Sequence, residues 1–473
     1  MSEIYSMSRR DIIAAGAVGA AGIIAAAPQA NEAKGADNGF VWGVASASAQ
    51  TESRQGRGRS NWDVFADTPG KIADGSSNAL TTEFETRFPE DLDLLKTAGV
   101  PAFRLSLAWP RVQPDGPGKP SQTGLDTYAR IFDAMQTRGI EPWPTMFHWD
   151  VPVWAGNFRS RDIAARMADY ADILVTRFGD RIKQWIILNE PNTASLLGYG
   201  FGRHAPGFAS QEAMLASVHH QNLALGLMTQ AARARASQGT PIGTTHNVAP
   251  IRSPSQEPAD LKAAAFADTL WNWAFLDPLF GRGYPAILEP LLAPLVQDGD
   301  LATIAAGKPD FLGVNNYSDI YIKADGVGIQ QADWPVDVER TDYFPVQPAV
   351  FESVLTGLCD RYGNIPLYVT ETGFAIDKAA PWETRINDER RSRYLDSYLS
   401  AAASAKTKGV DLRGLFYWSA TDNWEWSEGY TKRFGLIAVD PKTQRRGAKR
   451  SLAKFGEQVR RHFPDAVTSK PKI

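Results

Sequence analysis

Eight runs of large apolar residues, separated by segments with helical patterns, constrain the fold more than any other feature of the sequence. The runs are rich in Val, Ile, Leu, Phe and Trp and do not alternate cleanly with polar residues, which is typical of strands buried on both faces. They occupy residues 40–47, 100–109, 141–148, 184–190, 241–248, 310–317, 366–373 and 412–420.

The segments between these runs carry apolar residues at three- and four-residue spacing, as amphipathic helices do. Examples are 161–180, 211–236, 258–277 and 388–408, while 90–99 and 124–139 each end in glycine, a helix stop signal. Eight alternating strand and helix units predict an α/β fold, a single (β/α)8 TIM barrel. A doubly wound open sheet is the alternative, but no glycine-rich phosphate-binding motif follows the first run.

The first 36 residues differ from the rest of the chain. Arg9 and Arg10 precede an Ala/Gly/Ile run that is shorter than the ~20 residues of a membrane span. The segment resembles a bacterial twin-arginine export signal; an uncleaved anchor or a plain N-terminal extension are the alternatives. We therefore expect an export signal and flexible segment at 1–36 and a barrel catalytic domain at 37–473. The mature protein would be periplasmic or secreted and free of the membrane.

Composition excludes several classes of protein. A net charge of −3 shows no bias toward nucleic acids or anionic membranes, and one cysteine excludes an intramolecular disulfide framework. The 14 Trp residues are compatible with an ordinary core and equally with a groove for flat, C–H-rich ligands such as sugars.

Two glutamates end predicted strands. Glu190 ends the fourth run and Glu371 ends the seventh, and the C-terminal strand ends form the active face of such a barrel. Hydrolysis of a glycosidic bond uses two carboxyl groups, ~5–5.5 Å apart for retention and ~6.5–9.5 Å apart for inversion. A single Glu at a strand end is more often an ion-pair partner or a cap, but two at facing strands favour this chemistry. The sequence argues against a metal site, because the six His are scattered and His219 and His220 are expected on a helix.

The chain resembles glycoside hydrolase family 1, the retaining β-glucosidase family, over nearly all of residues 39–460. The matching stretches, in order, are "FVWGVASASAQTES", "FRLSLAWPRVQPDG", "FHWDVP", "WIILNEPN", "DFLGVNNYS", "YVTETGF", "FYWSATDNWEWSEGY" and "KRFGLIAVD". The resemblance implies a (β/α)8 barrel and a retaining exo-β-glycosidase. The activity would be that of a β-glucosidase that also accepts β-fucosides or β-galactosides and needs no cofactor.

The resemblance also implies roles for individual residues. Glu190 would be the general acid/base and Glu371 the nucleophile, whose negative charge should raise the pKa of Glu190. Arg104 and Tyr317 would keep the nucleophile ionised and oriented, and Asn189 would bond the sugar 2-hydroxyl.

The remaining candidates would recognise the sugar. Glu425 further implies an unphosphorylated sugar, because relatives acting on 6-phosphorylated sugars place a small hydroxyl residue there. The expected partner is a β-glycoside small molecule or oligosaccharide, not a nucleic acid. The full expected binding set is Gln50, His148, Trp149, Asn189, Asn315, Trp418, Glu425 and Trp426.

The sequence departs from the family pattern at several points. Thr372 follows the nucleophile where the family usually has Asn, and Asn316 replaces an aromatic residue. The tryptophan that commonly walls the leaving-group side is missing, with Tyr343 or Phe344 as its expected substitute. The segment 81–88, "TTEFETRF", is also atypical.

Two alternative functions remain open from the sequence. An endo-acting β-glucanase or xylanase would use the same pair of strands, although "DNWEWSEGY" supplies groups that would close a pocket around a terminal sugar. A non-catalytic sugar-binding barrel usually lacks one of the two carboxylates.

Overall fold

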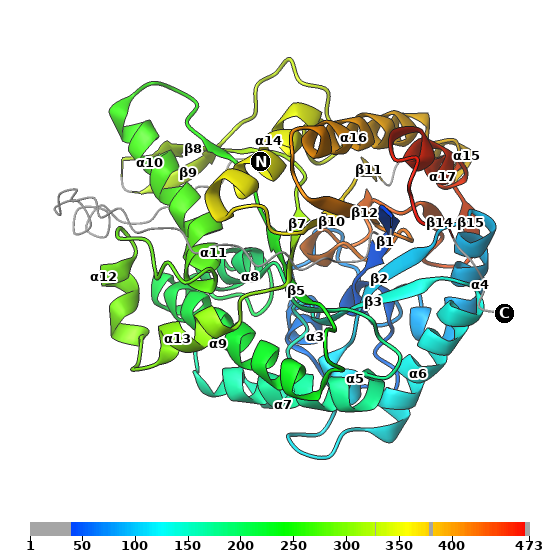
Figure 1. Cartoon of the computed structure of the whole chain (residues 1–473), viewed down its shortest axis with the longest axis horizontal. Coiled ribbons are helices and arrows are strands. Elements are labelled where there is room, and N and C mark those ends of the chain that lie inside the picture. The colour runs from blue at the N-terminus through cyan, green and yellow to red at the C-terminus, as the bar shows by residue number, and fades with distance from the viewer. Residues whose placement is uncertain (1–38, 327, 378–381, 469–473) are drawn as a thin grey trace.

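The computed structural model describes residues 39–326, 328–377 and 382–468, which form a closed barrel of eight parallel strands (Figure 1). Each predicted apolar run contains one barrel strand, so the (β/α)8 prediction is confirmed and the open sheet is excluded. Around the barrel the order is β1-β12-β10-β7-β5-β4-β3-β2. The strands are β1 (Val41–Ser46), β2 (Ala102–Ser106), β3 (Glu141–Phe147), β4 (Trp185–Asn189), β5 (Ile242–Asn247), β7 (Phe311–Asn315), β10 (Leu367–Thr372) and β12 (Leu412–Trp418).

Long helices surround the barrel (Figure 1). They are α4 (Phe84–Thr97), α6 (Gln122–Thr137), α7 (Asp162–Phe178), α9 (Gln211–Arg235), α10 (Pro258–Asp268), α14 (Pro348–Tyr362), α16 (Glu389–Thr407) and α17 (Arg450–His462). Sequence periodicity did not single out α14 and α17. The predicted helix at 258–277 is divided into α10, the π-helix η3 (Thr269–Trp273) and α11 (Ala274–Leu279).

Short elements lie in the loops between these units. The short helices are α2 (Ser48–Thr51), α3 (Asn61–Ala66), α5 (Trp109–Val112), α8 (Pro191–Thr193), α12 (Glu289–Leu292), α13 (Asp300–Ala306), α15 (Trp382–Ile386), the 3₁₀-helices η1 (Val153–Ala155), η4 (Ala293–Leu295) and η5 (Trp426–Glu428), and the π-helix η2 (Ala194–Gly200). One small sheet has the order β6 (Ile251–Arg252), β8 (Ile320–Ala324) and β9 (Ile329–Ala332). Two further sheets pair β11 (Ile376–Asp377) with β13 (Lys432–Arg433), and β14 (Ile437–Val439) with β15 (Arg446–Ala448).

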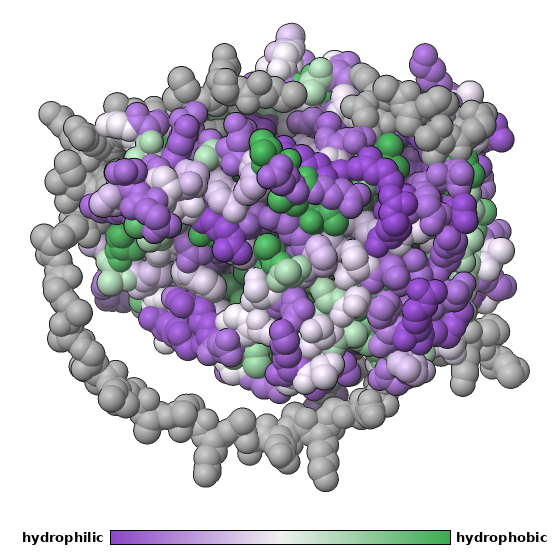
Figure 2. Space-filling view, turned by 90° about the horizontal axis from the view of Figure 1, so that it is seen from above, coloured by the Kyte–Doolittle hydropathy of each residue, from purple (hydrophilic) through white to green (hydrophobic). Residues whose placement is uncertain are grey.

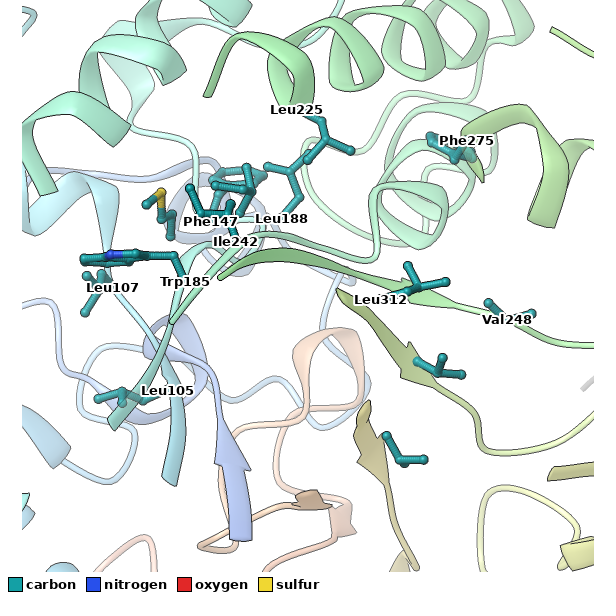
Figure 3. Packing of buried hydrophobic residues seen from close by; sticks show 14 of the residues in the cluster. Leu105, Leu107, Phe147, Trp185, Leu188, Leu225, Ile242, Val248, Phe275 and Leu312 are labelled. Atoms are coloured by element: carbon teal, nitrogen blue, oxygen red, sulfur yellow. The ribbon is translucent and has the colours of Figure 1, made fainter. Parts of the chain in front are cut away.

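The main core lies between the strands and the helices. Leu188, Ile242 and Leu312 project from neighbouring strands toward Leu225 of α9 and Phe275 of α11 (Figure 3). Each buried side chain of this size contributes ~1.5–3 kcal/mol relative to an exposed one. Continuous apolar runs were therefore the correct signal for strands covered on both faces.

Aromatic rings fill the interior of the barrel. Trp143 of β3 lies 4.9 Å from Tyr368 of β10, 5.1 Å from Phe416 of β12 and 5.9 Å from Phe311 of β7, measured between ring centroids. The interior is packed, as in other barrels of this kind, and polar chemistry is left to the C-terminal strand ends.

The two strands that carry the candidate carboxylates do not lie directly opposite each other. On one side β5 and β7 separate β4 from β10, and on the other side β3, β2, β1 and β12 do. The expectation that they face each other across the barrel was therefore wrong by one strand. The end of β7 lies between them on the shorter path.

The described surface is mostly hydrophilic, with hydrophobic residues in small groups on the face seen in Figure 2. Large exposed hydrophobic side chains are scattered: Val64, Leu80, Val153, Leu261, Leu301 and Val336. In the described part of the chain, no helix has the length and apolar character that crossing a membrane requires. The predicted export signal at 1–36 lies outside the described residues.

Candidate active site

Glu190 and Glu371 line one cavity of about 1300 Å³ at the C-terminal ends of the barrel strands. Glu190 directly follows β4, and its backbone N–H donates to the Thr245 carbonyl at 2.8 Å. Glu371 lies within β10, and each carboxylate side chain belongs to a residue only 4% exposed. The fold therefore brings together two ionisable groups that are 181 positions apart in the sequence (371 minus 190).

Strand irregularities direct both carboxylates. The pairing of β4 with β5 shifts between Ile186 and Asn189, and β10 shifts between Val369 and Glu371 against β7. Such irregularities re-aim side chains near active sites. Glu190 also has a positive φ of 45°, as do Trp149 at 75° and Trp426 at 48°. For residues with a side chain, this conformation costs ~1–3 kcal/mol and is concentrated at functional sites.

Asn315 at the end of β7 connects the fourth and seventh strands. Its amide nitrogen Nδ2 donates to Glu190 Oε1 at 2.6 Å and to Asn189 Oδ1 at 3.2 Å. Its Oδ1 accepts from the Thr370 hydroxyl at 2.7 Å, next to Glu371. The amide orientation is therefore fixed, and Asn315 presents a donor to Glu190.

Arg104 and Tyr317 bind the other carboxylate. Arg104 Nη1 donates to Glu371 Oε1 at 2.5 Å, and Tyr317 Oη donates to Glu371 Oε2 at 2.9 Å. Arg104 Nη2 donates to Asn189 Oδ1 at 2.5 Å. Both oxygens of Glu371 are thus held by groups that favour its ionised form.

The two carboxyl groups have different proton affinities. Burial, followed by the charge of Glu371, raises the pKa of Glu190 to about 7. Burial also raises the pKa of Glu371, but the Arg104 charge and the bonds from Arg104 and Tyr317 oppose it. Because Arg104 contacts Glu371 and not Glu190, Glu371 ionises first. Burial thus contributes more than the Glu371 charge, which was the only cause expected from the sequence.

The predicted site residues either line the cavity or lie directly behind its wall. Eight of the predicted residues line the cavity directly: His148, Trp149, Glu190, Tyr317, Glu371, Trp418, Glu425 and Trp426. The other four lie directly behind, each bonded to a lining residue: Gln50 to Glu425, Arg104 to Glu371, Asn189 to His148, and Asn315 to Glu190. The structure therefore brings all of them together.

Buried polar atoms remain available at this end of the cavity. Asn189 Nδ2 donates to His148 Nε2 at 2.9 Å, so the neutral ring carries its proton on Nδ1. Burial and the Arg104 charge hold the pKa of His148 well below its usual value, so the ring stays neutral. Neither His148 Nδ1 nor Gln50 Oε1 has a hydrogen-bond partner among the described residues. A ligand with several hydroxyl groups would satisfy both.

Indole rings surround these polar atoms. The Trp149 and Trp426 centroids are 4.6 Å apart, and the His148 ring lies 5.9 Å from Trp418. The Trp149 indole N–H donates to the Asn189 carbonyl at 2.8 Å, which fixes the ring. Aromatic rings beside hydrogen-bonding groups suit a ligand that has both apolar faces and polar edges.

The carboxyl group of Glu425 is a weaker acid than that of an exposed glutamate. Enclosure of its carboxyl raises its pKa to about 8, with the Gln50 amide, a donor at 3.0 Å, opposing the shift. Burial of this carboxyl therefore favours its protonated form.

The raised pKa of Glu425 predicts that the stability difference between wild type and Glu425→Gln depends on pH. Because the folded-state pKa of this carboxyl is raised, the folded protein loses stability as pH rises from 4.5, the pKa in the unfolded chain, to about 8. Glutamine does not ionise. Between pH 5 and pH 8.5 the free energy of unfolding of Glu425→Gln should therefore rise by roughly 1–3 kcal/mol relative to that of wild type. Urea unfolding of both proteins at the two pH values measures this difference. Glu457→Gln is the matched control, since it removes a carboxyl that is 72% exposed on α17, and no gain for Glu425→Gln would contradict the prediction.

The departures from the family pattern have separate explanations. Thr372 points away from the cavity, and its hydroxyl lies 2.6 Å from the Tyr394 hydroxyl of α16. Asn316 donates to the Val248 and Ser318 carbonyls and so shapes the loop after β7. The Glu371 carboxylate is bonded by Arg104 and Tyr317, and neither Thr372 nor Asn316 has a side-chain bond to it in the described structure.

The structure places Tyr343 and Phe344, the expected substitutes for the missing tryptophan, at the cavity wall. Both line the cavity, and the Phe344 ring lies 5.3 Å from Tyr317. The atypical segment 81–88 lies elsewhere: the Thr82 carbonyl accepts a bond from Arg446, and Glu85 bonds Ser53.

Sequence reasoning missed several lining residues. Thr193 and Asn247 line the cavity with Glu190, and polar interactions with their side chains lower the pKa of Glu190. Asn247 ends β5, so the strand-end rule that found Glu190 would also have found it. Trp271 and Trp334 come from η3 and a loop, and nothing in the sequence marked them.

The barrel and the asymmetric carboxylate pair at its C-terminal face define a glycoside hydrolase. The sequence profile of Glycosyl hydrolase family 1 matches residues 34–462, and the chain belongs to that family. No group of three or more His, Cys, Asp or Glu that could hold a metal ion occurs within the ranges that the structure describes.

Relatives of this chain include proteins named as β-glucosidases. A "Beta-glucosidase" of Agrobacterium sp. is 37% identical over 427 residues, covering 87% of this chain and 92% of the relative. A "Bifunctional beta-D-glucosidase/beta-D-fucosidase" of Bifidobacterium breve is 36% identical and covers 88% and 96%. The solved structure of a Thermotoga maritima β-glucosidase in complex with deoxynojirimycin matches with a TM-score of 0.83 at 33% identity, over 90% of this chain and 98% of that one.

Proposed function

We propose that this protein is a retaining exo-β-glucosidase that removes a terminal, unphosphorylated sugar from the non-reducing end of a β-glycoside. The observation that carries this function is the unequal environment of the two carboxyl groups. Glu371 is held ionised by Arg104 and Tyr317, and Glu190 keeps a proton near neutral pH. One nucleophile and one acid are what the double-displacement reaction requires.

In the first step, Glu371 attacks the anomeric carbon while the bond to the leaving oxygen breaks. Glu190 gives its proton to that oxygen, and the product is a glycosyl ester of Glu371 together with a free alcohol. Esterification removes the charge of Glu371, so the pKa of Glu190 falls and it becomes a base. Glu190 then takes a proton from water, whose oxygen attacks the anomeric carbon, and the Glu371 carboxylate leaves.

The surrounding residues have complementary roles in this proposal. Asn189, held by Arg104, bonds the 2-hydroxyl, while His148 Nδ1 and Gln50 Oε1 bond other hydroxyls through their unpartnered atoms. Trp418 lies beneath the apolar face of the ring. Trp426 and Glu425 close the end of the cavity, which supports exo rather than endo action. The presence of both carboxylates argues against a non-catalytic barrel.

The names of the relatives and the N-terminal sequence support two further features. The names of the relatives support glucose as the main sugar, with fucose as a second substrate. The pair Arg9 and Arg10, followed by an apolar run, supports export of the folded protein to the periplasm. Fusing residues 1–36 to a reporter and fractionating cells, with Arg9 and Arg10 both changed to Lys as control, tests that export.

Initial rates on nitrophenyl β-glycosides test the proposed function. The panel contains the glucoside, fucoside, galactoside, xyloside, cellobioside and 6-phosphoglucoside. We expect the glucoside or fucoside to be fastest and the 6-phosphoglucoside to be slowest, with ¹H NMR showing the β-anomer as the first sugar released. A first-formed α-anomer would contradict retention, and a dominant cellobioside rate without free glucose would favour an endo enzyme.

A further inference from the structure

The cavity extends far beyond the two carboxylates. Its volume of about 1300 Å³ exceeds the ~300–1,000 Å³ typical of sites for drug-sized ligands. One sugar ring between Trp418, Glu425 and Glu371 occupies only its inner end. The outer part is continuous with the acid Glu190, so the leaving group of the substrate must lie there.

One wall of this outer part is a sheet face covered by isoleucine. Ile251 of β6 pairs with Ile320 of β8, and Ile322 lies two residues further along the same strand and so on the same face. Ile329 of β9 pairs with Ala324, which also lies on that face. All four isoleucines line the cavity.

The facing walls are also apolar. The helical segment α10–η3 contributes Ala267, Leu270 and Trp271, and the π-helix η2 and the residue after it contribute Leu196, Leu197 and Phe201. The Trp271 indole N–H donates to the Asn247 carbonyl at 3.0 Å, so the ring offers its apolar surface to the cavity. Trp334 is similar, because its N–H donates to the Asp319 carbonyl at 2.8 Å.

Polar side chains lie mainly at the solvent end of this region. Gln331, Asp333 and Arg203 line the cavity and are exposed, and Lys323 is half-buried. Between this rim and the carboxylates the walls are mostly aliphatic or aromatic. A second sugar there would exchange hydration of several hydroxyls for contact with isoleucine, which is unfavourable.

From these walls we infer that the natural substrates are β-glucosides of bulky apolar alcohols, with leaving groups large enough for several fused rings, rather than oligosaccharides. The inference rests on the proposed function, since it places the sugar at Glu190 and Glu371. The apolar alcohol packs between the isoleucine face and Trp271, and its oxygen lies at the Glu190 carboxyl.

Alkyl β-glucosides from methyl to octyl measure this preference, because their leaving groups have similar intrinsic reactivity. We expect kcat/KM to rise roughly two- to fourfold per methylene, so more than about 100-fold across the series. Cellobiose should be hydrolysed less efficiently than octyl glucoside. A flat series, or cellobiose above octyl glucoside, would overturn the inference.

Two variants test whether the alkyl chain packs against the isoleucine face. Ile322→Gln should lower the octyl-to-methyl ratio of kcat/KM at least about threefold, and this ratio is independent of how much enzyme is folded. Leu261→Gln is the matched control: it makes the same change in character on α10 at a side chain 44% exposed and outside the cavity. An unchanged ratio in Ile322→Gln would place the alkyl chain elsewhere. A flat series beside rapid nitrophenyl glucoside turnover refutes only the inference, whereas no turnover of any glucoside refutes the proposed function as well.

Discussion

Replacing Glu371 by Gln is expected to lower kcat on nitrophenyl β-glucoside by roughly 10⁴- to 10⁶-fold. Glutamine keeps the size of the side chain and accepts the bond from Arg104, but it does not form the glycosyl ester. The loss should appear in kcat and in kcat/KM alike, because both steps pass through that ester. Steady-state kinetics with a highly purified variant measure it.

A chemical rescue separates the nucleophile from a structural role. Glu371→Gly leaves a space beside the anomeric carbon, and added azide should attack from that side to give an α-glucosyl azide. Glu141→Gln is the matched control, because Glu141 begins barrel strand β3 at the opposite end and its carboxylate accepts a bond from Lys183. A surface pair of this kind is worth ~1 kcal/mol or less, so full activity is expected. A Glu371→Gln enzyme within tenfold of wild type would sink the nucleophile assignment.

Replacing Glu190 by Gln is expected to affect substrates according to their leaving group. Alkyl glucosides, whose alcohols need a proton to depart, should lose roughly 10²- to 10⁴-fold in kcat/KM. Dinitrophenyl glucoside, whose phenolate leaves unaided, should still form the glycosyl enzyme. Its hydrolysis then lacks a base, so stopped-flow mixing should show a burst of dinitrophenolate followed by slow turnover.

The pH profile gives an independent measure of Glu190. In wild type the acid must be protonated, and because its pKa is raised to about 7, kcat/KM should fall as pH increases through about 7. Glu190→Gln should remove this descending limb, while Glu141→Gln should retain it. A limb that persists near pH 7 in Glu190→Gln would assign it to another group.

The sequence was informative about strands and less so about helices. Runs such as 184–190 are apolar on both faces because helices cover the outside and Trp143, Tyr368 and Phe416 fill the inside. Periodicity predicted the helical segment at 258–277 but not its change from α to π geometry at Thr269. Leu270 and Trp271 of that π segment line the cavity.

The candidate site shows the same division. Glu190, Glu371 and Arg104 were predicted because strand ends and short motifs specify them locally. The raised pKa of Glu425 was not predicted, since it depends on burial of the carboxyl and on its bond with Gln50, which lies 375 positions away. The isoleucine wall was also invisible, because Ile251, Ile320 and Ile329 become neighbours only through strand pairing.

The sequence by itself therefore determined the barrel, the family and the identity of the two carboxylates, since each rests on a local run of residues with a fixed chemical meaning. Only the tertiary structure decided that burial raises the pKa of Glu190 more than the Glu371 charge does, and which side chains line the outer part of the cavity. Proton affinity depends on burial and on neighbouring charges, and the shape of a cavity depends on side chains from distant segments. Both are properties of contacts in space rather than of positions along the chain.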